Sequence, residues 1–297
     1  MIAIAASLIA ALLYATASVL QHRAAVSAPV ERSMRLGLLA GLVSEPWWLA
    51  GVSADGLAFV MQFIALGHGP LVVVQPLLVS GLLFALPFGA IVSGGRIRPA
   101  ELWSGVAVVL GLAALLVAAH PGAGRTDVSS KVWISLGVAT AVPVVVLVLA
   151  SVRWTRAKPG LLASAAGFIY GLTAALAKTT AHLLSTGVGS CFESWEPYVL
   201  VAGGLLGMLL CQSAFQAGPL RTSLPLLTVV DPIVSIGIGV LAFHEPIAQD
   251  PLRLVVESLG LVVMVGGVMA LGHSPLIDLM DVPPTPASGN DLTAGEH

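Results

Sequence analysis

Charged residues are scarce in this sequence. Only 9% of its 297 residues are Asp, Glu, Lys or Arg, whereas 57% are hydrophobic. A soluble domain carries about 25% charged residues, so this composition excludes an ordinary soluble domain. The chain also lacks a basic patch, and we therefore expect no nucleic-acid partner.

Enzyme motifs are missing as well. The sequence contains no H-E-x-x-H, no P-loop, no G-x-S-x-G and no Cys/His metal cluster. We therefore predict that the protein is not an enzyme, needs no cofactor and is not driven by ATP. The two cysteines, Cys191 and Cys211, are expected at different depths of a membrane, so no disulfide is predicted.

Long apolar runs are what the sequence does have. A membrane-spanning helix needs roughly 20 apolar residues, and nine stretches qualify approximately. The first has no basic residues ahead of it, which argues against a secretory signal peptide. We predict an all-α fold, a polytopic membrane helix bundle of nine transmembrane helices, with a tenth helix at 34–46 as the alternative. The nine stretches are 2–20, 47–66, 71–92, 102–119, 132–152, 161–184, 198–217, 220–243 and 254–271.

Lys and Arg residues favour nine helices over ten. Short cytoplasmic loops of membrane proteins accumulate positive charge. Nine helices place nine basic residues on one side, the side of Arg153, and three on the other, whereas ten helices give six on each side. We therefore expect a multi-pass protein of the cell (inner or plasma) membrane, with its N-terminus outside and its C-terminus in the cytoplasm.

A ten-residue motif occurs twice. "GPLVVVQPLL" begins at Gly69 and "GPLRTSLPLL" begins at Gly218, and "EPWWLAG" and "EPYVLVA" precede them. The displacement is five helices, an odd number, so the two copies cross the membrane in opposite directions, as in the inverted repeats of many transporters. We predict a first repeat at 1–120 (helices one to four), a linker helix at 121–158, a second, inverted repeat at 159–272 and a disordered cytoplasmic tail at 273–297.

These motifs resemble the drug/metabolite transporter (EamA-like) superfamily, and within it the NIPA-like magnesium transporters. The Trp-Trp-x-x-Gly start of 47–66, the "GPLVVVQPL" corner and "AGFIYGLTAALAK" carry the resemblance, which covers nearly all of the chain outside the tail. "AFHEPI" is similar to a Gly-Glu ending in that superfamily, with His244 where Gly is usual. The resemblance implies a carrier or permease, and the nine-helix count is closer to the NIPA-like branch.

Ionisable residues within the predicted spans are candidates for a transport pathway, because each costs at least ~2.5 kcal/mol near the bilayer centre. Helical geometry predicts that Lys178 and Asp231 face one cavity and pair there, although a merely structural pair is the alternative. The prolines are expected to break or bend helices at a gate, unless they only shape packing. The pathway candidates are Asp55, Gln62, Lys178, His182 and Asp231, and the helix-breaking candidates are Pro76, Pro225 and Pro232.

Other polar and small residues have structural interpretations. Gln75, Gln212 and Gln216 are expected to hydrogen-bond neighbouring helices. Two pairs of glycines, Gly203 with Gly207 and Gly260 with Gly267, allow helices to approach closely, either within the bundle or across a possible homodimer.

Two functions fit this pattern. The first is a secondary transporter of a small metabolite or drug, possibly proton-coupled, in which Lys178 holds a substrate carboxylate. The alternative is a NIPA-like magnesium transporter in which Asp55 and Asp231 face the hydrated ion, since Mg²⁺ needs only one or two carboxylates. A non-transporting scaffold is the third, less favoured interpretation. Either transporter needs a lipid bilayer and a small-molecule or ion substrate as its partners.

Overall fold

The residues described by the computed structural model form helices, and no strand occurs among them. These residues are 1–26, 45–81, 83–84, 98–118, 124–125, 128–246 and 250–272. The predicted tail, the alternative helix at 34–46 and the end of the span at 71–92 lie outside them. The elements are α1 (Ile2–Val26), α3 (Pro46–His68), α4 (Leu71–Val79), α6 (Pro99–Ala118), α7 (Ser130–Arg153), η2 (Thr155–Ala157), α8 (Lys158–Thr186), α9 (Val188–Glu193), α10 (Glu196–Ala217), α11 (Leu220–Leu241) and α12 (Pro251–Gly272).

Seven of the described helices are long and apolar enough to cross a membrane. They are α1, α3, α7, α8, α10, α11 and α12. α6 is apolar too, and the nine residues of α4 are the described part of another predicted span. The expectation of an all-α, membrane-embedded bundle is therefore confirmed, while the total of nine helices stays a prediction.

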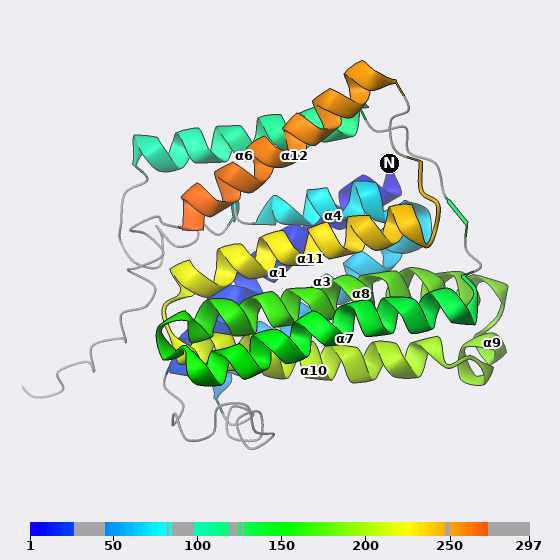
Figure 1. The fold of residues 1–297 in the computed structure, drawn as a ribbon, viewed down its shortest axis with the longest axis horizontal. Coiled ribbons are helices and arrows are strands. Elements are labelled where there is room, and N and C mark those ends of the chain that lie inside the picture. The colour runs from blue at the N-terminus through cyan, green and yellow to red at the C-terminus, as the bar shows by residue number, and fades with distance from the viewer. Residues whose placement is uncertain are drawn as a thin grey trace, which may run out of the picture.

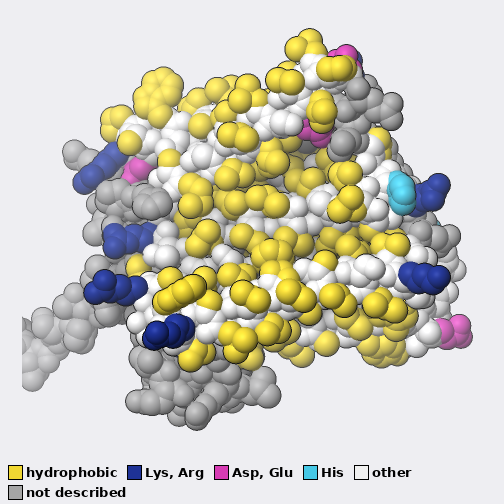
Figure 2. Space-filling model, in the orientation of Figure 1, with side chains coloured by type: hydrophobic (Ala, Val, Ile, Leu, Met, Phe, Trp, Pro, Cys, Tyr) yellow, Lys and Arg dark blue, Asp and Glu magenta, His cyan; other side chains and the backbone are white. Residues whose placement is uncertain are grey.

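Successive helices run in alternating directions between two ends of the molecule (Figure 1). We call these ends the Arg153 end, where α7 finishes and α8 begins, and the α9 end, where α8 finishes and α10 begins. Basic side chains gather at the Arg153 end, at the left of Figure 2. The basic residues with described side chains there are Arg98, Arg153, Arg156, Lys158 and Arg221, against Arg125, Lys131 and Arg253 at the α9 end.

Several pairs of helices pack closely against each other. α1 packs on α3, and α8 packs on α10. α4 and α11 contact each other in the middle of the bundle, and α6 crosses α12 on one side of it (Figure 1). α7 lies against α8 and turns Val145 and Leu149 outward, as a lipid-facing helix does.

Glycines allow the closest of these contacts. A Cβ on Gly267 would lie 2.8 Å from the Ser104 carbonyl oxygen, and one on Gly260 would lie 2.8 Å from the Gly111 carbonyl oxygen. The equivalent atom on Gly203 would meet Thr173 at 2.7 Å. The small-residue faces predicted from the sequence thus pack within one chain, and the homodimer stays a prediction.

The two Gly-Pro corners have the same backbone conformation. Pro70 (φ −74°, ψ 154°) and Pro219 (φ −64°, ψ 144°) are both extended and immediately precede a helix. Proline suits such a position because its φ is fixed and the first turn needs no N–H donor from it. The repeated motif therefore serves the same structural purpose at both sites, starting α4 at one end and α11 at the other.

The prolines inside the second copy do not break their helix. α11 is continuous from Leu220 to Leu241 and contains both Pro225 and Pro232. The expectation that these two prolines break the helix is therefore wrong, whereas bending or gating at them stays a prediction. Pro76 lies inside α4, three residues before its described end.

Candidate functional site

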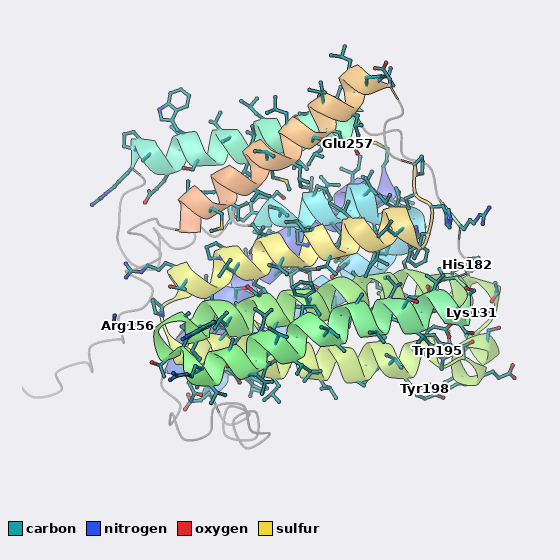
Figure 3. The ribbon with its side chains drawn as sticks, in the orientation of Figure 1. Lys131, Arg156, His182, Trp195, Tyr198 and Glu257 are labelled. Carbon is teal, nitrogen blue, oxygen red and sulfur yellow. The ribbon has the colours of Figure 1, made fainter. Side chains whose placement is uncertain are left out.

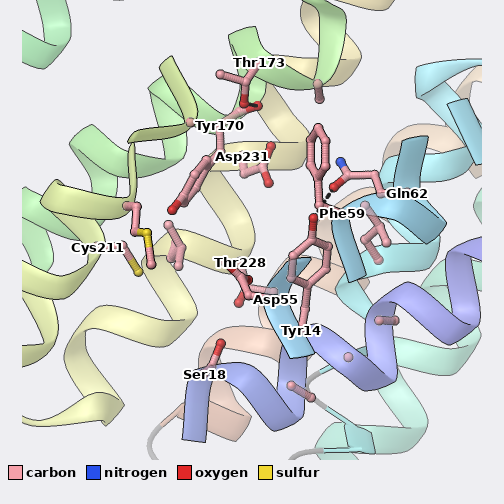
Figure 4. A pocket seen from close by; sticks show the side chains of 18 of the residues that line it. Tyr14, Ser18, Asp55, Phe59, Gln62, Tyr170, Thr173, Cys211, Thr228 and Asp231 are labelled. Carbon is pink, nitrogen blue, oxygen red and sulfur yellow. Dashed lines mark hydrogen bonds between the residues drawn. The ribbon is translucent and has the colours of Figure 1, made fainter. Parts of the chain in front are cut away.

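A cavity of about 470 Å³ lies inside the bundle. Its walls come from six helices, α1, α3 and α4 on one side and α8, α10 and α11 on the other. Figure 4 shows the polar side chains that point into it, among them Asp55, Asp231, Tyr14 and Tyr170. None of the described side chains of α6, α7 and α12 is among the lining residues. The cavity therefore lies between the two predicted repeats.

Two carboxylates face this cavity. Asp55 comes from the middle of α3, and Asp231 from the middle of α11. The Ser235 hydroxyl donates a hydrogen bond of 3.0 Å to the Asp231 carboxylate, and Gln21 lines the same cavity as Asp55. Two of the predicted pathway candidates, Asp55 and Asp231, therefore lie on one internal cavity, and their part in transport stays a prediction.

Two tyrosines at matched positions of the repeats also line the cavity. The Tyr14 hydroxyl of α1 donates a 2.5 Å hydrogen bond to Gln62 Oε1 of α3. Gln62, a predicted site residue, thus lines the cavity together with Tyr14. Tyr170 of α8 packs over Gly207 of α10, where a Cβ would come within 2.6 Å of the ring. Gly207 thus makes room for an aromatic side chain in the cavity wall.

Glutamines contribute in two different ways. Gln212 of α10 donates a hydrogen bond to Gln21 of α1, which confirms the helix-to-helix role expected for Gln212. Gln75 of α4 is only 1% exposed and lines the cavity, yet neither atom of its amide has a hydrogen-bond partner among the described residues. A buried amide without partners costs about 1–3 kcal/mol. Gln75 is therefore placed to bind something that enters the cavity, a role that the sequence alone did not reveal.

Lys178 and His182 belong to a different part of the molecule. Neither lines the cavity, and His182 lies at the α9 end of α8 (Figure 3). Lys178 forms an ion pair with Glu245, and its ammonium group lies 4.8 Å from the centre of the Phe243 ring. The predicted pairing of Lys178 with Asp231 inside one cavity is thus wrong.

The depth of residues along the predicted helices could not identify Glu245 as the partner of Lys178. Glu245 lies just after α11, outside the predicted spans, and the chain folds back so that its carboxylate meets the start of α4. One signal was present, because "AFHEPI" resembles a Gly-Glu ending. The structure also explains that pattern: His244 has φ +51°, a left-handed conformation that glycine adopts most easily.

The charge of the cavity has one sign. Among the described residues that line it, Asp55 and Asp231 are the ionisable carboxylates, and none is Lys, Arg or His. The described residues also contain no group of three or more His, Cys, Asp or Glu side chains close enough to hold a metal ion. The site therefore offers two carboxylates and several neutral donors and acceptors.

The helices and the internal cavity together define a polytopic, membrane-embedded helical bundle. An uncharacterized protein of Corynebacterium glutamicum is 32% identical to the chain over 276 residues, which cover 92% of this chain and 96% of that protein. The chain therefore belongs to the same family as this corynebacterial protein. No protein-family model matches the chain, and no solved structure matches it.

Proposed function

We propose that this protein is a secondary transporter that moves a small solute through the cavity between its two halves. The observation that carries the proposal is the position of Asp55 and Asp231 on one cavity walled by three helices from each half. Charged groups are expensive inside a membrane, so those that face an internal cavity mark a pathway by default. A scaffold would gain nothing from keeping them.

The opposite directions of corresponding helices support the predicted inverted repeats and, with them, alternating access. α1, α3 and α4 run opposite to α8, α10 and α11, respectively, in Figure 1. The contacts of α1 with α3 and of α8 with α10 correspond, and the partners α4–α11 and α6–α12 are the pairs that a two-fold axis would bring together. Two such halves can exchange conformations, which opens a central site to each side in turn. This arrangement agrees with the resemblance to drug/metabolite transporters.

The charge of the cavity favours a cation as the solute. With Lys178 paired elsewhere, no described basic side chain remains to hold a substrate carboxylate. Asp55 or Asp231 can bind an ammonium group or exchange it for a proton, the faces of Tyr14 and Tyr170 suit a cation, and Gln75 offers an amide. We therefore favour a small organic cation over an anionic metabolite.

Magnesium is the second candidate. Two carboxylates on one cavity suit a hydrated Mg²⁺ ion, which keeps most of its water ligands. In either case we infer a location in the cell membrane with the Arg153 end in the cytoplasm, because basic residues favour that side.

Ligand-induced stabilisation of the purified protein tests this proposal. A ligand at a hundred times its dissociation constant stabilises the folded state by about 2.7 kcal/mol, which raises the melting temperature. We expect primary amines, quaternary ammonium ions or Mg²⁺ to stabilise the wild type and anionic metabolites to have no effect. Asp55→Asn and Asp231→Asn should remove the stabilisation, whereas Glu101→Gln, a buried carboxylate outside the cavity, should keep it. Stabilisation by anions alone, or equal responses in all variants, would contradict the proposal.

A further inference from the structure

A charged contact joins the two halves between the cavity and the α9 end. The described cavity lining runs from Leu224 to Pro232 on α11 and from Tyr170 to Ala174 on α8, and on α4 it begins at Gln75, whereas on α10 it reaches Leu200. Beyond the lining of α4 and α8, the fully buried side chains of Leu71 and Leu176 pack in one cluster with Phe243, which follows α11.

Glu245 joins the halves at this place. One carboxylate oxygen accepts a 2.9 Å hydrogen bond from the Leu71 N–H, and the other accepts a 2.9 Å hydrogen bond from the Val72 N–H. These N–H groups are at the start of α4, where the helix dipole favours negative charge. Lys178 of α8 completes the contact, and the side chains of Lys178 and Glu245 are 6% and 0% exposed. The Glu245 carboxylate of the second half thus binds the N-terminus of α4 in the first half.

The surrounding backbone fits this carboxylate closely. A Cβ on Gly239 would lie 2.6 Å from Glu245 Oε2, and one on Gly124 would lie 3.0 Å from Glu245 Cγ. Gly124 itself has φ +64°, and the Arg125 N–H donates to the Phe243 carbonyl oxygen at 2.6 Å. His244 is held in a strained left-handed conformation beside Glu245. Strain of this kind persists where neighbouring contacts fix it, and it accumulates at switching elements.

We propose that Glu245, Lys178 and the N-terminus of α4 form a gate that keeps the cavity closed at the α9 end. Release of Glu245 from α4 opens the cavity there, while the cavity in the closed state is reached from the Arg153 end. The gate acts on the positions of Gln75 and Pro76, since these residues follow the clamped N-terminus on the same short helix.

A native cysteine reports the state of this gate. Cys211 lines the cavity, and the chain has one other cysteine, Cys191. In a Cys191→Ser background, a small membrane-impermeant thiol reagent is applied to intact cells and to inverted membrane vesicles. We expect Cys211 of the otherwise unchanged protein to react from the Arg153 end only. Glu245→Gln and Lys178→Met should each raise its reaction rate from the α9 end by about tenfold or more, because they shift the population towards the open gate.

Two further variants keep the test sharp. Glu101 accepts a hydrogen bond from the Arg98 N–H at the start of α6, so Glu101→Gln removes the charge of a comparable buried cap away from the gate and should leave labelling one-sided. Gly239→Ala crowds Glu245 without changing any charge and should open the gate as Glu245→Gln does, which covers the case in which a charge variant fails to fold. One-sided labelling in folded Glu245→Gln and Gly239→Ala would overturn the gate.

The gate rests on the proposed transport role of the cavity, but labelling reads water access rather than transport. A protein that shows the predicted change in sidedness yet moves no solute would refute the transporter and keep the gate. If the protein transports a solute but the sidedness of labelling is unchanged in the gate variants, the gate is refuted and the transporter is kept.

Discussion

Four carboxylates inside the described part of the bundle are of two kinds. Glu101 and Glu245 accept hydrogen bonds from backbone N–H groups at the starts of helices, and Glu245 also pairs with Lys178. Asp55 and Asp231 instead face the cavity, where none of the described lining residues is basic. The first kind holds the fold together, whereas the second kind stays available for binding.

This distinction predicts opposite effects on stability. Glu245→Ala leaves Lys178 without its carboxylate and the start of α4 without its cap, and breaking a buried pair costs about 3–5 kcal/mol. Asp231→Asn removes a charge that has no described basic partner, so the free energy of unfolding should stay the same or increase. Unfolding of the two purified variants by heat or denaturant checks both expectations. An equal loss in both would show that Asp231 is also a structural residue.

His244 gives a second prediction at this scale. A non-glycine residue in the left-handed region costs about 1–2 kcal/mol. His244→Gly removes that strain, although glycine gives back part of the gain through the greater freedom of the unfolded chain. We expect a melting temperature equal to or above that of the wild type. A clear loss of stability would mean that the imidazole, whose Nδ1 lies 3.2 Å from the Ala242 carbonyl oxygen, outweighs the strain.

The crossing of α6 and α12 shows how an element is fixed by its small residues. α12 has glycines at 266 and 267, adjacent in sequence but on different faces of the helix. A Cβ on Gly267 would press against the Ser104 carbonyl oxygen and Val108, whereas one on Gly266 would meet nothing within 4 Å. The α6–α12 contact therefore depends on one of the two and not on the other.

Alanine at these neighbouring positions should separate packing from helix propensity. Gly267→Ala overpacks a backbone contact and is expected to destabilise the protein by about 1–3 kcal/mol. Gly266→Ala has room, and alanine favours a helix interior by about 1 kcal/mol over glycine, so it should be neutral or stabilising. The melting temperatures of the two variants and the wild type, measured side by side, test both expectations. Equal effects would mean that α6 and α12 do not pack as closely as described.

At the scale of elements, much could be predicted from the sequence. Apolar runs located the helices, the Gly-Pro motifs located two helix starts, and the cost of charge inside a membrane singled out Asp55 and Asp231. The partner of Lys178 could not be predicted, because Glu245 reaches it only through the path of the chain after α11. The lack of described hydrogen-bond partners for the Gln75 amide could not be predicted either, because it depends on how the helices around the cavity pack.

The whole molecule has a charge asymmetry that predicts its orientation. Five basic residues with described side chains gather at the Arg153 end, and we therefore expect this end to face the cytoplasm. Cys191, in α9 at the other end, should then react with an impermeant thiol reagent applied to intact cells in a Cys211→Ser background. A reporter enzyme fused after residue 297 should be active only in the cytoplasm. Labelling of Cys191 from the cytoplasmic side would reverse the orientation.

Uptake into proteoliposomes tests the central claim, that Asp55 and Asp231 line the pathway of a transported cation. Radiolabelled organic amines and Mg²⁺ are offered to liposomes that contain the wild type, Asp55→Asn, Asp231→Asn or Glu101→Gln, with and without a proton gradient. We predict uptake of at least one cation by the wild type and by Glu101→Gln, and a loss of about a hundredfold in one or both aspartate variants, since a buried charge pair between protein and solute contributes several kcal/mol. Cation uptake that is unchanged in both aspartate variants, or no uptake of any offered cation by folded wild type, would contradict the claim.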